Sequence, residues 1–190
     1  MENKVPPKTF HIFYAWAEGP WHGKALVSVM RKAGFIESSD SEATILIAHS
    51  VGSFLIKANK NNRIILLIGP PYWPGKSISR RLFKKVWLDF KSHQKSLIFW
   101  VQKMIWTTVY IVTKPSLTLE AWRAVHLKDP FVRVSDQAII IQNSEDVFCS
   151  PLLATLIKNK AIILPGQHDD CWDNPGPYLE LVEKLYSQQL

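Results

Sequence analysis

The sequence predicts an α/β fold, a mostly parallel sheet of about five strands flanked by helices. Two observations support this prediction. Short apolar runs rich in β-branched residues alternate along the chain with helical patterns. These runs are apolar at nearly every position, which is typical of strands buried on both faces of a parallel sheet. The chain has 190 residues, 47% of them hydrophobic, so it can bury a full core, and we expect one domain over 1–190.

The expected elements follow from this alternation. We expect strands near 9–15, 43–49, 63–69, 137–143 and 160–165, and helices near 22–33, 51–59, 151–159 and 176–188. The segment 34–43 is too short for a further strand and helix, so the five strands should be neighbours in sequential order. Right-handed crossovers would then place successive helices on one face, leaving only the last helix on the other. A homodimer would cover the rest of that face.

The most informative segment is 44–53, an apolar run that stops at Ser50. Ala48 and Gly52 stand two residues to either side of this serine. A tight strand-to-helix turn requires small residues at those two positions, because larger ones would clash across it. The segment therefore indicates a nucleophile elbow. The alternative is a buried strand that runs into a helix capped by Ser50 or Ser53.

Two later turns supply partners for a nucleophilic serine. The run 138–146 ends in Glu145 and Asp146, and the run 161–168 ends in His168. Each candidate follows the end of an expected strand, and open parallel sheets gather their functional groups at the carboxyl ends of strands. The order along the chain is serine, acid, histidine.

On these three loops the chain resembles the α/β-hydrolase superfamily, as a small serine hydrolase or esterase-like member with a reduced sheet. Ala48-His-Ser-Val-Gly52 is similar to the superfamily's elbow, with Ala in place of the first Gly. The resemblance implies that Ser50 attacks an acyl carbon, His168 carries the proton, and Asp146 orients the imidazole, with Glu145 as the reserve acid. It implies no cofactor.

The same resemblance suggests an oxyanion hole and a substrate class. We expect one donor at the N–H of Val51 and a second near Trp16 or Ala17, in the loop after the first strand. The expected reaction is hydrolysis of a small-molecule acyl substrate, a carboxylic ester or thioester, through an acyl-enzyme. The alternatives are an inactive binding protein of the same fold or, less favoured, a basic protein that binds a membrane or nucleic acid.

The long segment between the third and fourth expected strands, 70–131, is interpreted as an inserted helical cap. Residues 76–95 contain seven basic and one acidic residue over an apolar stripe, which suits an anionic membrane surface or an anionic substrate. The next helix, 97–112, is largely apolar and could line an acyl-chain pocket with Phe99, Trp100, Met104 and Trp106. The alternative is ordinary packing of the cap onto the sheet.

Other classes of site and partner find less support. The spacing in His168-Asp-Asp-Cys171 fits no standard zinc pattern, so we expect no metal. The chain is basic but contains no recognised nucleic-acid-binding motif, so we do not expect it to bind nucleic acid. Only Cys149 and Cys171 occur, too few for a disulfide framework, and the polar N-terminus has no pattern of a signal peptide. These features favour a cytoplasmic protein.

Overall fold

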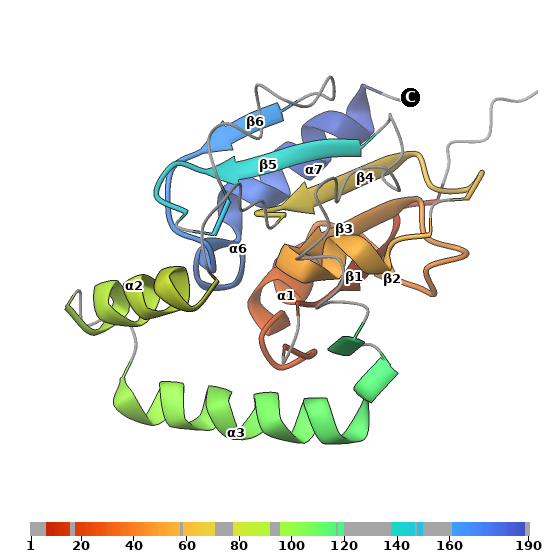
Figure 1. Cartoon of the computed structure of the whole chain (residues 1–190). Helices are drawn as coiled ribbons and strands as arrows, with labels where there is room; N and C mark the ends of the chain where they lie inside the picture. The colour runs from red at the N-terminus through yellow and green to blue at the C-terminus, as the bar shows by residue number, and fades with distance from the viewer. Residues whose placement is uncertain are drawn as a thin grey trace, which may run out of the picture.

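A computed structural model of the chain contains a six-stranded parallel sheet with helices packed against it (Figure 1). The structure describes residues 7–15, 18–57, 59–70, 78–91, 96–116, 118–119, 138–146, 148–149 and 161–188.

Every pair of neighbouring strands in the sheet is parallel. The strands, in the order β2-β1-β3-β4-β5-β6 across the sheet, are β1 (Thr9–Phe13), β2 (Ile36–Glu37), β3 (Ile45–His49), β4 (Ile64–Ile68), β5 (Ala138–Asn143) and β6 (Ala161–Leu164). All residues of β3 and β4 are buried, as expected for the centre of a sheet covered on both faces. The five strands expected from the sequence are confirmed.

Those five strands are neighbours in sequential order, as expected, but a sixth strand that was not predicted, the short β2, pairs with the outer side of β1. Its two residues lie opposite Thr9 and Phe10. Gly34, with a φ of 83°, turns the chain back directly after the first helix, so the return to the sheet needs few residues. The segment 34–43 is therefore long enough for a strand after all.

The extra strand also changes which helices share a face. The helices α1 (Lys24–Lys32) and α7 (Gly176–Ser187) cover the same face of the sheet, where Leu26 and Met30 pack in one cluster with Val182 and Leu185. Our expectation that the first and last helices lie on opposite faces was wrong. The chain moves outward from β1 to β2 and then crosses back to β3, and right-handed crossovers in opposite directions place their connections on opposite faces.

The second face carries a separate cluster that includes Leu46, Leu67 and Ile140. Directly after β3, Ser50–Leu55 forms the 3₁₀ segment η1 in place of the helix expected over 51–59. The hydroxyl of Ser53 donates to the carbonyl of Ser50 at 2.6 Å, which occupies the acceptor that the first α-helical bond would use. The expected helix at 151–159 lies outside the described residues.

Among the described residues, two complete helices lie between β4 and β5. They are α2 (Ile78–Lys91) and α3 (Leu97–Thr113), and the hydroxyl of Ser96 caps α3 by accepting from the N–H of Phe99. Figure 1 shows both helices to one side of the sheet, with α3 along the lower edge of the view. No helix in the described ranges combines the length and apolar character needed to cross a membrane. The extent of a cap over 70–131 stays a prediction.

Candidate active site

Ser50 stands at the end of β3 in a strained backbone conformation. Its φ is 50°, and among the described residues it is the one non-glycine residue with a positive φ. A left-handed conformation costs an L-residue about 1–2 kcal/mol, so it persists where the surrounding structure enforces it. The turn has the geometry that the sequence predicted for an elbow, and the half-buried serine stands at its apex.

Gly52, two residues after Ser50, must be small because β1 ends against this turn. A Cβ atom at Gly52 would stand 2.5 Å from the carbonyl oxygen of Phe13 and 2.7 Å from that of Tyr14. Ala48 is fully buried and pairs with Phe13 across β1 and β3. The contact with the end of β1 explains the requirement for glycine at position 52.

Asp146 and His168 form a buried hydrogen-bonded pair. The imidazole Nδ1 donates to Oδ2 of Asp146 at 2.7 Å. The other carboxylate oxygen, Oδ1, accepts from the backbone N–H groups of Phe148 at 2.7 Å and Cys149 at 3.1 Å. Because Nδ1 of His168 carries a proton, Nε2 is the ring nitrogen that has a free lone pair. Glu145, the reserve acid, is exposed, so Asp146 is the carboxylate that contacts the histidine.

The elbow and the Asp146–His168 pair meet at the carboxyl ends of neighbouring strands. His49 pairs with Ile68 across β3 and β4, so the following residues, Ser50 and Gly69, leave the sheet side by side. A Cβ atom at Gly69 would stand 2.8 Å from Oδ2 of Asp146 and 3.0 Å from Nδ1 of His168. The hydrogen bonds found among the described residues do not include one between the Ser50 hydroxyl and His168. Catalytic hydrogen bonds commonly tighten only when substrate is present.

A second buried pair, which sequence reasoning missed, lies beside the elbow. Nδ1 of His49 donates to Oε2 of Glu18 at 3.0 Å, and the same oxygen accepts from the N–H of Ala15 at 3.0 Å. Nε2 of His49 donates to the backbone carbonyl of His168 at 2.9 Å. Both ring nitrogens of His49 therefore act as donors, which describes an imidazolium paired with a carboxylate.

The charges on this pair stabilise each other. Burial alone would raise the pKa of Glu18, but the charge of His49 lowers it to about 2. Burial alone would lower the pKa of His49, but its interactions with Cys171 and Glu18 raise it well above its ordinary value. Because burial also raises the pKa of the Cys171 thiol to about 11, that thiol is neutral near pH 7, and we assign the effect on His49 mainly to Glu18. Nothing in the sequence linked Glu18 to His49, since the two lie 31 residues apart.

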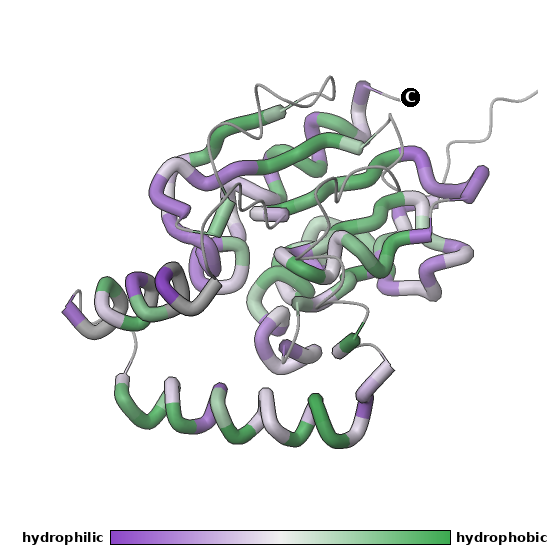
Figure 2. The backbone as a smooth tube through the Cα atoms, in the orientation of Figure 1, coloured by the Kyte–Doolittle hydropathy of each residue, from purple (hydrophilic) through white to green (hydrophobic). Residues whose placement is uncertain are grey.

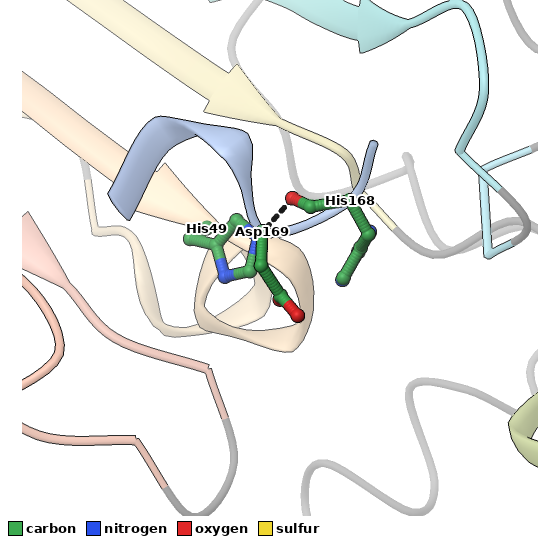
Figure 3. A group of neighbouring side chains, drawn as sticks. All are labelled: His49, His168 and Asp169. Atoms are coloured by element: carbon green, nitrogen blue, oxygen red, sulfur yellow. Dashed lines mark hydrogen bonds between the residues drawn. The ribbon is translucent and has the colours of Figure 1, made fainter. Parts of the chain in front are cut away.

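His49, His168 and Asp169 also form a group whose possible metal-ligating atoms lie within 4.8 Å of one another (Figure 3). The two ring nitrogens of His49 already donate hydrogen bonds to Glu18 and to the His168 carbonyl, and Nδ1 of His168 donates to Asp146. A metal ion would have to displace these bonds. The group therefore fits a hydrogen-bonded junction between the elbow and the histidine loop better than a metal site.

A pocket of about 330 Å³ lies beside this junction. Its lining comes from the loop before α1, including Glu18 and Trp21; from α3, including Phe99 and Trp106; and from α6 (Asp170–Asp173). The rings of Trp21 and Trp106 lie 5.1 Å apart, centroid to centroid. Of the four aromatic and apolar residues predicted to line an acyl-chain pocket, Phe99 and Trp106 line this one. Trp100 and Met104 are not among its lining residues, and Met104 is 65% exposed.

The remaining predicted residues are placed as follows. Val51 lies in the first turn of η1, where backbone N–H groups have no partner within the helix. Trp16 lies outside the described residues. Cys149 and Cys171, both described, are not joined by a disulfide, and they belong to the clusters on opposite faces of the sheet.

The architecture is that of the α/β hydrolases. Similar solved structures include a hydrolase from Oleispira antarctica, with a TM-score of 0.61, 14% sequence identity, and coverage of 95% of this chain and 91% of that chain. An α/β hydrolase from the metagenome of sediments of the Mar Chica lagoon in Morocco gives a TM-score of 0.57 at 12% identity, covering 96% and 92%. A thioesterase domain from the curacin biosynthetic pathway gives 0.53 at 12% identity, covering 93% and 90%.

At these identities the likeness establishes the fold alone. No family model matches the sequence, and no curated protein sequence matches it either.

Proposed function

From an α/β-hydrolase fold with a serine at its elbow, we propose that the chain is a serine hydrolase that cleaves a carboxylic ester or thioester. The observation that carries the proposal is the 2.7 Å bond between His168 and Asp146 at the strand ends beside Ser50. A serine, a histidine and an acid on three loops of one sheet edge are the parts that acyl transfer needs. The α/β-hydrolase structures that resemble this chain support the same class of chemistry.

In the proposed mechanism, the Ser50 hydroxyl attacks the acyl carbon while Nε2 of His168 accepts its proton. The Asp146 carboxylate accepts a hydrogen bond from Nδ1–H throughout while the proton stays on Nδ1, which fixes the tautomer and stabilises the imidazolium. The tetrahedral intermediate carries its charge on the former carbonyl oxygen, and the N–H of Val51 would donate to it. Trp16 is the proposed source of a second donor.

The intermediate collapses when the bond to the leaving group breaks and His168 returns the proton to the departing alcohol or thiol. Water then attacks the acyl-enzyme, with His168 again as the base, and releases the carboxylic acid and free Ser50. The aromatic pocket beside the junction, together with a helical cap over 70–131, would bind the acyl group. The thioesterase domain among the similar structures supports thioesters as one substrate class.

The test is turnover of a panel of p-nitrophenyl esters and acyl thioesters that differ in chain length. Wild-type protein should hydrolyse some members, and Ser50→Ala and His168→Ala should each lower kcat by about 10³-fold or more with the fold retained. Turnover that survives in both variants would contradict the proposal.

The second candidate is a binding protein of the same fold without turnover. One observation favours it: neither Ser50 nor His168 lines the 330 Å³ pocket. In that case no member of the panel is hydrolysed, and Ser50→Ala and His168→Ala bind a fluorescent fatty acid as tightly as the wild type. Loss of turnover in the two variants, from a wild type that has it, would exclude this candidate.

A further inference from the structure

The helix α3 presents apolar side chains to the outside of the molecule. Eight of them are between 40% and 72% exposed, and they form what we call the α3 outer row: Leu97, Ile98, Val101, Met104, Ile105, Val109, Ile111 and Val112. Single exposed apolar side chains are ordinary, but a continuous set on one element marks an interaction surface. Figure 2 shows this helix with apolar, green segments along much of its length.

The two sides of α3 differ in kind. At 3.6 residues per turn the α3 outer row occupies an arc of roughly 160°, while the four residues that line the pocket fall in a separate arc of roughly 100°. The helix's one lysine, Lys103, belongs to the pocket side, where its ammonium lies 5.7 Å from the ring of Trp100. An ordinary surface helix has the reverse arrangement, with charges outward and apolar residues inward.

The polar side chains on and near the outer arc form hydrogen bonds within the helix itself. Thr108 is the one polar residue of α3 in that arc, and its hydroxyl donates to the carbonyl of Met104 at 3.1 Å. The neighbouring hydroxyls of Thr107 and Thr113 donate in the same way to the carbonyls of Lys103 and Val109, both at 2.7 Å. A hydroxyl that is satisfied within its own helix can enter an apolar medium without losing a hydrogen bond to water.

The charge that accompanies this apolar surface is strongly positive. The chain has 23 basic and 16 acidic residues, and the stretch 78–114 contains eight of the basic residues and one of the acidic ones. The rest of the chain has fifteen of each, so its formal net charge is zero. Arg80, Lys84 and Lys91 of α2 are exposed, and so are the aromatic side chains of Phe83 and Trp87. The whole formal net charge of +7 therefore resides in α2, α3 and their connections.

We propose that α2 and α3 form a surface that docks on an anionic lipid bilayer. The α3 outer row lies in the interface and enters the acyl region, and the basic side chains of α2 contact the phosphate groups. An uncharged apolar row on the helix that follows a basic, aromatic-bearing helix matches an anionic bilayer, which combines a hydrocarbon interior with negatively charged headgroups. The opposite side of α3 lines the pocket together with residues from the body of the protein. The helix therefore lies flat on the membrane surface and does not cross it.

Charge complementarity favours the bilayer over a second copy of the chain. Two copies joined through this surface would bring two sets of α2 basic residues together, and like charges in an interface oppose association. An anionic bilayer attracts the same residues.

The experiment is flotation of the full chain with vesicles of ether-linked phosphatidylcholine, with and without ether-linked phosphatidylglycerol. Ether lipids resist ester hydrolysis, so binding is read independently of any activity. Wild-type protein should float with the anionic vesicles and not with the neutral ones, and added salt should weaken binding. The charge variant Arg80→Glu with Lys84→Glu should bind at least about tenfold more weakly, and so should the row variant Ile98→Ser with Ile105→Ser.

Each variant has a matched control. Lys57→Glu with Lys60→Glu makes the same charge change on exposed lysines near η1. Ile36→Ser with Ile163→Ser removes two isoleucines that are 67% and 64% exposed at the two edges of the sheet. Both controls should bind like the wild type.

Three results would overturn the proposal. One is folded wild-type protein that does not bind anionic vesicles, and another is a control pair that weakens binding as much as its test pair. The third is a stable dimer in sedimentation velocity that the row variant dissociates and its control does not, which would assign the α3 outer row to a second copy.

Discussion

His49, the residue before the elbow serine, donates from Nε2 to the backbone carbonyl of His168 at 2.9 Å. Their rings lie 4.7 Å apart, centroid to centroid. The loop that holds the proposed base is thereby fixed to the strand that holds the proposed nucleophile, although the two residues are 119 positions apart. Glu18 keeps His49 doubly protonated, so a buried carboxylate hydrogen-bonded to His49 helps to position the histidine loop.

Glu18→Gln should destabilise the protein by about 3–5 kcal/mol, because removing one partner of a buried ion pair leaves the other without compensation. Unfolding in urea measures this loss. Glu183→Gln, an exposed position on α7, should change the free energy of unfolding by no more than about 0.5 kcal/mol. Equal effects of the two substitutions would contradict the buried ion pair.

The Glu18–His49 pair should also make stability depend on pH. The pKa of Glu18 is lowered from 4.5 to about 2, so its contribution is complete above pH 4.5 and is lost as the pH falls toward 2. The pKa of His49 is raised well above 6.5, so its contribution is complete below pH 6.5 and is lost as the pH rises through the raised value. The difference in unfolding free energy between wild type and Glu18→Gln with His49→Gln should therefore be largest between about pH 4.5 and 6.5. A difference that does not vary with pH would contradict these assignments.

Asp146→Asn should lower kcat by about 10³–10⁴-fold while the protein stays folded, because the amide can still accept the two backbone N–H bonds but cannot stabilise an imidazolium. Glu145→Gln, next to it and exposed, should keep most of the activity. Steady-state kinetics on the best ester of the panel would measure both. A larger loss in Glu145→Gln than in Asp146→Asn would assign the acid to position 145.

Gly52→Ala should destabilise the protein by about 1–3 kcal/mol, because the added methyl would stand 2.5 Å from the backbone oxygen of Phe13. Gly176→Ala is the matched control, since its Cβ would meet its nearest neighbour at 4.0 Å. Its unfolding free energy should stay within about 0.5 kcal/mol of wild type. Urea unfolding of the two variants tests whether the elbow is packed against the end of β1 as described.

The sequence predicts those elements whose burial or crowding determines the residue types within the element itself. Strands β3 and β4 are buried at every position and therefore read as continuous apolar runs. The elbow could be predicted because the crowding around Ser50 acts on residues two positions away, Ala48 and Gly52. Asp146 and His168, which form a hydrogen-bonded pair, could be picked out because each follows the end of such a run.

The missed features depend on contacts that leave no local pattern. The strand β2 has two residues, both exposed, so neither length nor alternation marks it. Its absence from the prediction also led to the wrong face for α1. The pairing of Glu18 with His49 joins two loops, and its residue types have no fixed spacing. The apolar surface of α3 predicted burial, but the structure has no buried residue on that helix.

The most direct test of the central claim is labelling of the purified protein with a fluorophosphonate probe, with the modified residue mapped by mass spectrometry. The probe reacts with serines that an adjacent base activates. We predict a single label on Ser50 in the wild type, and none on Ser50→Ala or His168→Ala protein that remains folded. Folded wild-type protein that stays unlabelled at Ser50, or a Ser50 label that persists in His168→Ala, would contradict the account.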